Sequence, residues 1–98
     1  MKVKNKRGTS VRTCYCSNWL QHWRKFTGEV TYSCRAEGCN RTDIVGAHVL
    51  RTVSYDNREY IVPLCKLHNK ADGFVELKPW TKLAPANVKN TCGNGQLL

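Results

Sequence analysis

The sequence predicts a single small α+β domain. Its 98 residues are enough for one hydrophobic core, and an apolar share of 41% is typical of a folded chain. Residues 18–27 carry apolar side chains at helical spacing, whereas residues 44–50 and 60–62 are short apolar runs on either side of a turn. Because a core of this size is modest, the presence of six cysteines indicates that cross-links add to its stability.

The predicted helix covers residues 18–27. Its apolar side chains recur about one turn apart: Trp19, Leu20, Trp23 and Phe26. Ser17 suits the N-cap position and Gly28 ends the run. We interpret the apolar stripe as the face that packs this amphipathic helix onto the rest of the domain.

The remaining elements are short strands and one further helix. The predicted strands are residues 29–34, 44–50, 60–62 and 74–77. Residues 56–58 form the turn between the two central strands, and Pro63 is expected to end the second of them. A helix then opens at Leu64 and closes near Gly73, and an extended C-terminal segment follows.

Positive charge is concentrated at the start of the chain. Sixteen Lys and Arg outnumber seven Asp and Glu, for a formal net charge of +9. The first acidic residue is Glu29, and seven basic residues precede it: Lys2, Lys4, Lys6, Arg7, Arg12, Arg24 and Lys25. We predict that residues 1–13 form a basic flexible arm and residues 14–98 the folded domain. Such an arm suits neutralisation of nucleic-acid phosphates, and its alternative role is a solubilising tail.

The sequence also bears on location. No apolar run approaches the roughly 18 residues of a membrane-spanning helix, and no hydrophobic stretch follows the basic start as in a signal peptide. We therefore expect a cytoplasmic protein without membrane contacts. In a reducing compartment six cysteines favour metal ligation, with disulfides as the alternative.

Four residues have the spacing of a structural zinc site. Cys34 and Cys39 are separated by four residues in a turn-like segment, and Cys65 and His68 lie three apart at the start of the second predicted helix. Two ligands from a turn and two from a helical turn can converge tetrahedrally on one Zn²⁺. Zinc bound there would supply stability that the small core lacks.

The remaining cysteines and one histidine form a second candidate zinc set: Cys14, Cys16, His22 and Cys92. A Cys-x-Cys pair can place two thiolates on one ion where the backbone turns, and Cys92 would tie the C-terminal segment to the first helix. The alternatives are a disulfide between Cys92 and one of the two N-terminal cysteines, or unligated thiols.

The stretch from Cys34 to Lys70 combines a paired-cysteine turn, a hairpin strand reading Gly-Ala-His-Val and a helix start reading Leu-Cys-x2-His-Asn. In this order it resembles a treble-clef zinc finger of the HNH endonuclease type, with an HNH-like core at about residues 34–72. The resemblance implies that His48 is the general base in hydrolysis of a DNA phosphodiester and that Asn69 helps to hold a catalytic Mg²⁺ or Mn²⁺.

Three positions depart from the family pattern. Ala47 stands where members often carry Asp or another ligand, Tyr60 stands where an asparagine orients the imidazole, and Asn69 replaces the final histidine. Because Mg²⁺ prefers carboxylate oxygen, His48 and Asn69 form an incomplete catalytic set unless Asp72 contributes. The alternative for His48 is a buried strand histidine bonded to the backbone, or a spare metal ligand.

The sequence leaves three functions open. The first is a small metal-dependent DNA endonuclease, the second a non-catalytic zinc-stabilised module that binds nucleic acid, and the third an adaptor for an acidic protein partner. No P-loop, dinucleotide-binding glycine pattern or Gly-x-Ser-x-Gly motif is present. Nucleotide hydrolysis, redox cofactor chemistry and serine hydrolysis are therefore disfavoured.

Overall fold

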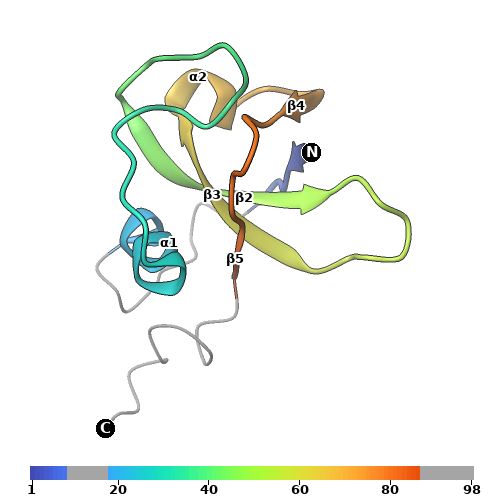
Figure 1. The fold of residues 1–98 in the computed structure, drawn as a ribbon. Coiled ribbons are helices and arrows are strands. Elements are labelled where there is room, and N and C mark those ends of the chain that lie inside the picture. Colours follow the sequence, from blue (N-terminus) through green and yellow to red (C-terminus); the bar gives the residue numbers. More distant parts are fainter. Residues whose placement is uncertain (9–17, 87–98) are drawn as a thin grey trace, which may run out of the picture.

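A five-stranded antiparallel sheet organises the chain in a computed structural model that describes residues 1–8 and 18–86. The strands follow the order β4-β1-β2-β3-β5, and two helices accompany them (Figure 1). The strands are β1 (Lys2–Asn5), β2 (Ile44–Arg51), β3 (Glu59–Cys65), β4 (Phe74–Glu76) and β5 (Ala84–Pro85), and the helices are α1 (Trp19–Thr27) and α2 (Lys66–Asn69). The predicted α+β class is confirmed.

The sheet buries side chains on both of its faces. β2 and β3 pair from Ile44 opposite Cys65 to Leu50 opposite Glu59, and alternate residues point to opposite sides. One face carries a core of Val3, Ala47, Val49, Tyr60, Val62, Leu64 and Val75, which packs with residues 34–39, the cysteine segment. On the other face Ile61 and Ala84 pack against Trp23 and Trp19 of α1. The two helices therefore lie on opposite faces of the same sheet.

The prediction of a flexible N-terminal arm is wrong for residues 2–5, because these residues form β1, an interior strand of the sheet. β1 pairs with β2 on one side, where Val3 lies opposite Arg51, and with β4 on the other, where Val3 lies opposite Val75. Val3 is fully buried, whereas Lys2 and Lys4 are exposed. Basic and buried residues alternate along β1 with the two-residue period of a strand. Its backbone hydrogen bonds to β2 and β4 stabilise this strand despite the charge of the two lysines. Residues 9–13 of the predicted arm lie outside the described residues.

Helix α1 agrees with the predicted helix in extent but not in every contact. Asn18 is its N-cap, in place of the predicted Ser17, because the Asn18 side chain accepts a hydrogen bond from the Gln21 N–H. Trp23 is buried as expected, and its Nε1 donates to the carbonyl of Lys82 at 2.8 Å. Phe26, by contrast, is 46% exposed, since the packed face of the helix does not extend to its last turn.

Close approach of α1 to the sheet depends on Gly46. A Cβ added to this residue would lie 2.4 Å from the carbonyl carbon of Trp19 and 2.5 Å from the nitrogen of Leu20, both of them backbone atoms. Any side chain at position 46 would therefore push the first turn of α1 away from β2. The glycine fixes how near the helix lies to the strand.

Two predictions about strands are wrong. Residues 29–34 form no strand, and Tyr32 is exposed. Pro63 does not end its strand: β3 continues to Cys65, with Pro63 opposite Gly46. Since Lys66 N–H bonds to Asp43 and bonded pairs alternate along the hairpin, Pro63 occupies a non-bonded position toward β2, where no N–H is needed. Its carbonyl accepts from the Arg35 N–H at 3.0 Å.

The β2–β3 connection is organised by a buried carboxylate. Asp56 accepts hydrogen bonds from the Tyr60 hydroxyl at 2.7 Å, from the Arg58 backbone N–H at 3.0 Å and from the Arg51 guanidinium at 3.2 Å. Hydrogen bonds from the Arg58 side chain and then from Tyr60 hold the pKa of Asp56 well below its usual value. The turn expected at residues 56–58 is thus held by its own first side chain.

Replacement of this carboxylate should give a pH-dependent loss of stability. The folded state depresses the pKa of Asp56, so its contribution to the free energy of unfolding is complete above the unfolded value of about 3.9 and is lost as the pH falls below it. We expect the free energy of unfolding of Asp56→Asn to be lower than that of the wild type by a constant amount from pH 5 to 8. Urea titrations should show that this difference in free energy becomes smaller below about pH 4. A margin that does not change with pH would contradict this role.

Candidate metal centre

Four ligand-type side chains converge beside the start of α2. Cys34 and Cys39 come from a closed turn, in which the Cys34 N–H bonds to the Arg41 carbonyl and the Cys39 N–H bonds to the Ala36 carbonyl. Gly38, directly before Cys39, has the positive φ of 76° that lets the turn reverse. An isolated bridge between Ala36 and Leu77 fixes this segment to the end of β4.

Cys65 and His68 come from the junction of β3 and α2. Cys65 is the last residue of β3 and the N-cap of α2, and its sulfur accepts a hydrogen bond from the His68 N–H at 3.4 Å. The Asn5 side chain donates to the carbonyls of His68 and Ala71, at 2.8 and 3.1 Å. Strand β1 therefore holds the one-turn helix, and with it the imidazole, in place.

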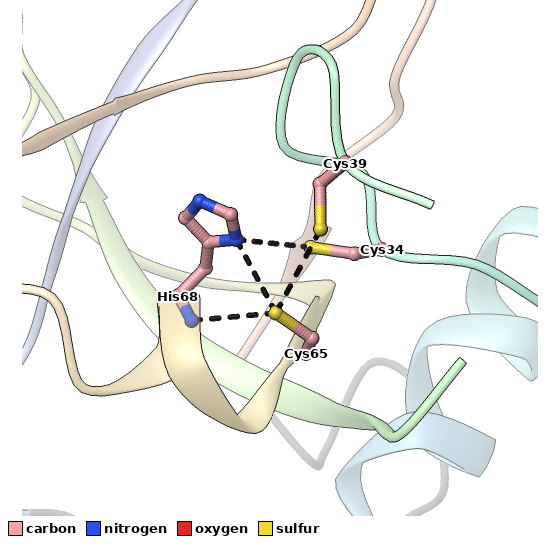
Figure 2. A group of neighbouring side chains, drawn as sticks. All are labelled: Cys34, Cys39, Cys65 and His68. Atoms are coloured by element: carbon pink, nitrogen blue, oxygen red, sulfur yellow. Dashed lines mark hydrogen bonds between the residues drawn. The ribbon is translucent and has the colours of Figure 1, made fainter. Parts of the chain in front are cut away.

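The spacing of the four ligand atoms fits a tetrahedral zinc ion. His68 Nδ1 lies 3.2 Å from Cys65 Sγ and 3.6 Å from Cys34 Sγ, and the sulfurs of Cys39 and Cys65 are 3.9 Å apart (Figure 2). All four atoms lie within 4.8 Å of one another. Bonds of roughly 2.3 Å to sulfur and 2.0–2.1 Å to nitrogen in a tetrahedron imply ligand separations of about 3.6–3.8 Å. The predicted set can hold a metal ion, and its chemistry is that of structural zinc.

The protonation of the thiols is set by their surroundings. Burial raises the pKa of Cys34 to about 11, whereas the backbone N–H of Arg41 lowers the pKa of Cys39. No disulfide joins the three cysteines of the described part of the chain. A buried neutral thiol ionises when a divalent cation replaces its proton, so metal binding here releases protons and weakens with acidity.

The ligand set is of the structural rather than the catalytic kind. Three cysteines and one histidine would fill all four positions around a tetrahedral zinc ion, whereas catalytic zinc sites keep one position for water or substrate. Lys78 donates to the Cys39 carbonyl at 2.7 Å, and the Lys78 N–H bonds to the Arg35 carbonyl. These contacts hold the segment after β4 on the cysteine turn, so the ligand cluster joins β3, α2 and this later segment.

The structure does not bring His48 and Asn69 together on one face. Asn5 and Val49 are opposite each other and face α2, as the bonds of Asn5 show. His48, adjacent in β2, points to the other side, where its ring lies edge-on to Trp19 of α1 with centroids 4.4 Å apart. His48 is buried there, and Asp72 pairs with Arg7. His48 and the helix that carries Asn69 therefore lie on opposite sides of the sheet.

The second candidate zinc set is largely outside the described residues, because Cys14, Cys16 and Cys92 all fall there. His22 is fully buried on α1, and its Nε2 donates to the Pro85 carbonyl at 2.7 Å. Burial lowers the pKa of His22, so the imidazole is neutral and packs α1 on β5. Nδ1 is the nitrogen that a metal would have to use.

The predicted nucleic-acid contacts divide between two elements. Lys2 and Lys4 lie on β1, Arg24 and Lys25 lie on the last turn of α1, and Lys6 and Arg7 follow β1. Arg12 lies outside the described residues. Sequence reasoning missed Asn5 as the support of α2. The alternation of residues 2–5, which marks a strand, was the signal that could have revealed it.

No helix in the described ranges is long and apolar enough to cross a membrane. Comparisons of the chain with models of known protein families, with curated proteins and with solved structures found no match. The conclusion that the fold and the site support together is a small α+β domain with a Cys₃His cluster able to hold a metal ion.

Proposed function

We propose that the protein is a zinc-stabilised module that binds nucleic acid without cleaving it. The order of cysteine turn, hairpin and helix is the one expected for a treble-clef finger, which supports a structural role for the metal. The observation that carries the binding proposal is the placement of basic residues from two distant elements on the same side of the sheet.

That placement follows from the strand register. Lys4 lies opposite Leu50, which shares its face of β2 with His48, and His48 contacts Trp19 of α1. Lys2 and Lys4 therefore project on the side that α1 occupies, and α1 carries Arg24 and Lys25 in its last turn. A sheet face and a helix end with like charge suit a phosphate backbone that crosses both.

An exposed aromatic ring adds to this surface. Phe74 lies opposite Lys4 in β4, so it projects on the same side, and it is 65% exposed. Aromatic rings beside basic groups contact bases while the basic groups neutralise phosphates. In the HNH-type alternative a general base and a metal ligand must lie beside the same metal ion. His48 and the helix that carries Asn69, however, lie on opposite sides of the sheet.

Salt-dependent binding tests the proposal. We expect retardation of oligonucleotides at low salt, with the logarithm of the binding constant falling linearly with the logarithm of salt concentration. Lys2→Ala/Lys4→Ala should weaken binding and reduce that slope by about two, one for each lost phosphate contact. Lys66→Ala/Lys70→Ala is the matched control, since it removes the same charge from two exposed lysines at the start and the C-cap of α2.

Two results would contradict the proposal. Equal losses in the two double variants would mean that net charge, rather than a defined face, governs binding. Cleavage of nucleic acid with Mg²⁺ or Mn²⁺ that disappears in His48→Ala would establish the endonuclease alternative instead.

A further inference from the structure

Trp80 is presented to solvent by a strained turn. The turn covers residues 78–81 in the segment between β4 and β5 (Figure 1), and the Thr81 N–H bonds to the Lys78 carbonyl at 3.3 Å. Trp80 has a φ of 65°, and it is the one non-glycine residue with positive φ in the described part of the chain. Glycine or asparagine would adopt this conformation at lower cost. The indole nevertheless is 94% exposed, so packing does not explain its presence.

The backbone of this turn is held firmly on the cysteine segment. Arg35 donates to the Thr81 hydroxyl at 3.0 and 3.2 Å and to the Pro79 carbonyl at 3.4 Å. The Thr81 hydroxyl in turn donates to the Lys78 carbonyl at 2.7 Å. Arg35 directly follows the metal-ligand candidate Cys34, so the same segment orders both the metal cluster and the turn.

The far end of the turn is fixed as well. The carbonyl of Lys82 accepts the hydrogen bond from Trp23 of α1. Trp80 therefore stands between two anchored points, the cysteine segment and α1. A large aromatic side chain that projects from a fixed backbone is pre-organised for contact with a ligand, because little backbone entropy is lost on binding.

The charges around Trp80 indicate the chemistry of that ligand. Lys78 and Lys82 flank it within two residues, Arg35 contacts the turn, and Glu29 pairs with Lys82 at 3.2 Å. Over the turn, its flanking residues and these contacts, three cations stand against one carboxylate, so the balance of charge is positive. An open π face among cations is complementary to a base together with its phosphate.

We propose that Trp80 stacks on an unpaired base, so that the ligand of this module is single-stranded nucleic acid or a strand with exposed bases. The inference rests on the proposed nucleic-acid binding and adds the kind of strand. In a duplex the faces of internal bases are covered by their neighbours, so an indole fixed at a turn has no face to stack on. Phosphate contacts from β1 and α1 do not make this distinction, whereas Trp80 does.

Substitution at this turn separates a binding role from a structural one. Trp80→Gly removes the indole and relieves the positive-φ strain, so the melting temperature should stay the same or rise. Affinity for a single-stranded oligonucleotide should fall about tenfold by fluorescence anisotropy, as for loss of one stacked base. Affinity for the matching duplex should not change, and Trp80→Phe should retain most single-strand binding.

Tyr55→Ala is the matched control. Tyr55 is 84% exposed in the β2–β3 connection, but no Lys or Arg lies within two residues of it in the sequence, whereas two lysines lie that close to Trp80. We expect this variant to bind both oligonucleotides as the wild type does. A loss equal to that of Trp80→Gly would assign the effect to any exposed aromatic ring and overturn the inference.

The remaining outcomes distinguish the inference from the function beneath it. Unchanged single-strand affinity in Trp80→Gly, with salt-dependent binding intact, would overturn the role of Trp80 and leave the proposed function standing. A lower melting temperature of Trp80→Gly would mean a structural role. If the wild type binds neither oligonucleotide, both proposals fail, and contact with a protein partner becomes the explanation for the exposed indole.

Discussion

Chelation of zinc is expected to unfold the domain cooperatively. The four ligands come from the cysteine turn, from the end of β3 and from α2, so a bound metal ion would join these three segments at one point. Binding of structural zinc contributes on the order of 10–16 kcal/mol in zinc-finger peptides, which matches or exceeds the whole stability of about 5–15 kcal/mol of a typical domain. Thermal melts followed by circular dichroism should show a cooperative unfolding transition without chelator and no such transition with a strong chelator. Added zinc should restore the transition.

Exchange of one ligand provides a sharper version of the same experiment. His68→Ala should lose the metal and the cooperative transition, whereas His68→Cys keeps four ligands of the kinds that zinc accepts and should retain both. Elemental analysis of each protein measures the outcome directly. A chelated wild type that melts like the metal-loaded protein would contradict a structural role for zinc. Two zinc ions per wild-type chain would support the second set, to which Cys14, Cys16, His22 and Cys92 were assigned.

Enlargement of Gly46 should be the most damaging change away from the metal ligands. The added Cβ of Gly46→Ala meets backbone atoms of Trp19 and Leu20 at 2.4 and 2.5 Å, and backbone cannot yield as a flexible side chain can. Overpacking of this kind costs about 1–3 kcal/mol. For a domain of this size a loss of 1 kcal/mol lowers the melting temperature by roughly 4–8 °C. We expect the melting temperature to fall by at least that much, and further for Gly46→Val.

Gly73→Ala is the control for this change. No atom lies within 4 Å of a Cβ built at Gly73, and the residue does not have a positive φ. Alanine there should leave stability unchanged or raise it slightly, because it restricts the unfolded chain. Wild-type stability of Gly46→Ala would show that α1 does not pack on β2 as described.

The metal cluster and the central hairpin could be predicted because their signals are local. The spacing of Cys34 and Cys39 and of Cys65 and His68 limits how far apart each pair can lie, and a tetrahedral ion explains why the pairs meet. The β2–β3 hairpin follows from two apolar runs around a turn. The extent of α1 likewise follows from the spacing of Trp19, Leu20 and Trp23.

The parts that failed depend on contacts distant in sequence. β1 contains one fully buried apolar residue, Val3, and its strand character comes from partners more than 40 positions away. The side on which His48 lies depends on the face of β2 that α1 covers, and a one-residue change of register would reverse it. Pro63 was expected to end a strand because the bonding pattern, which spares that position, cannot be read from composition.

The position of β1 has a consequence for how the protein is made. β1 is synthesised before both of its partners, and the amine of Met1, directly before β1, pairs with Glu76, 75 positions away. Pairing across such distances makes folding slow, because the chain must close a large loop before these contacts form. Until residues 74–76 are synthesised, β1 has no partner on one side and presents an open strand edge. A chaperone can bind this edge, or a strand of another chain can pair with it wrongly.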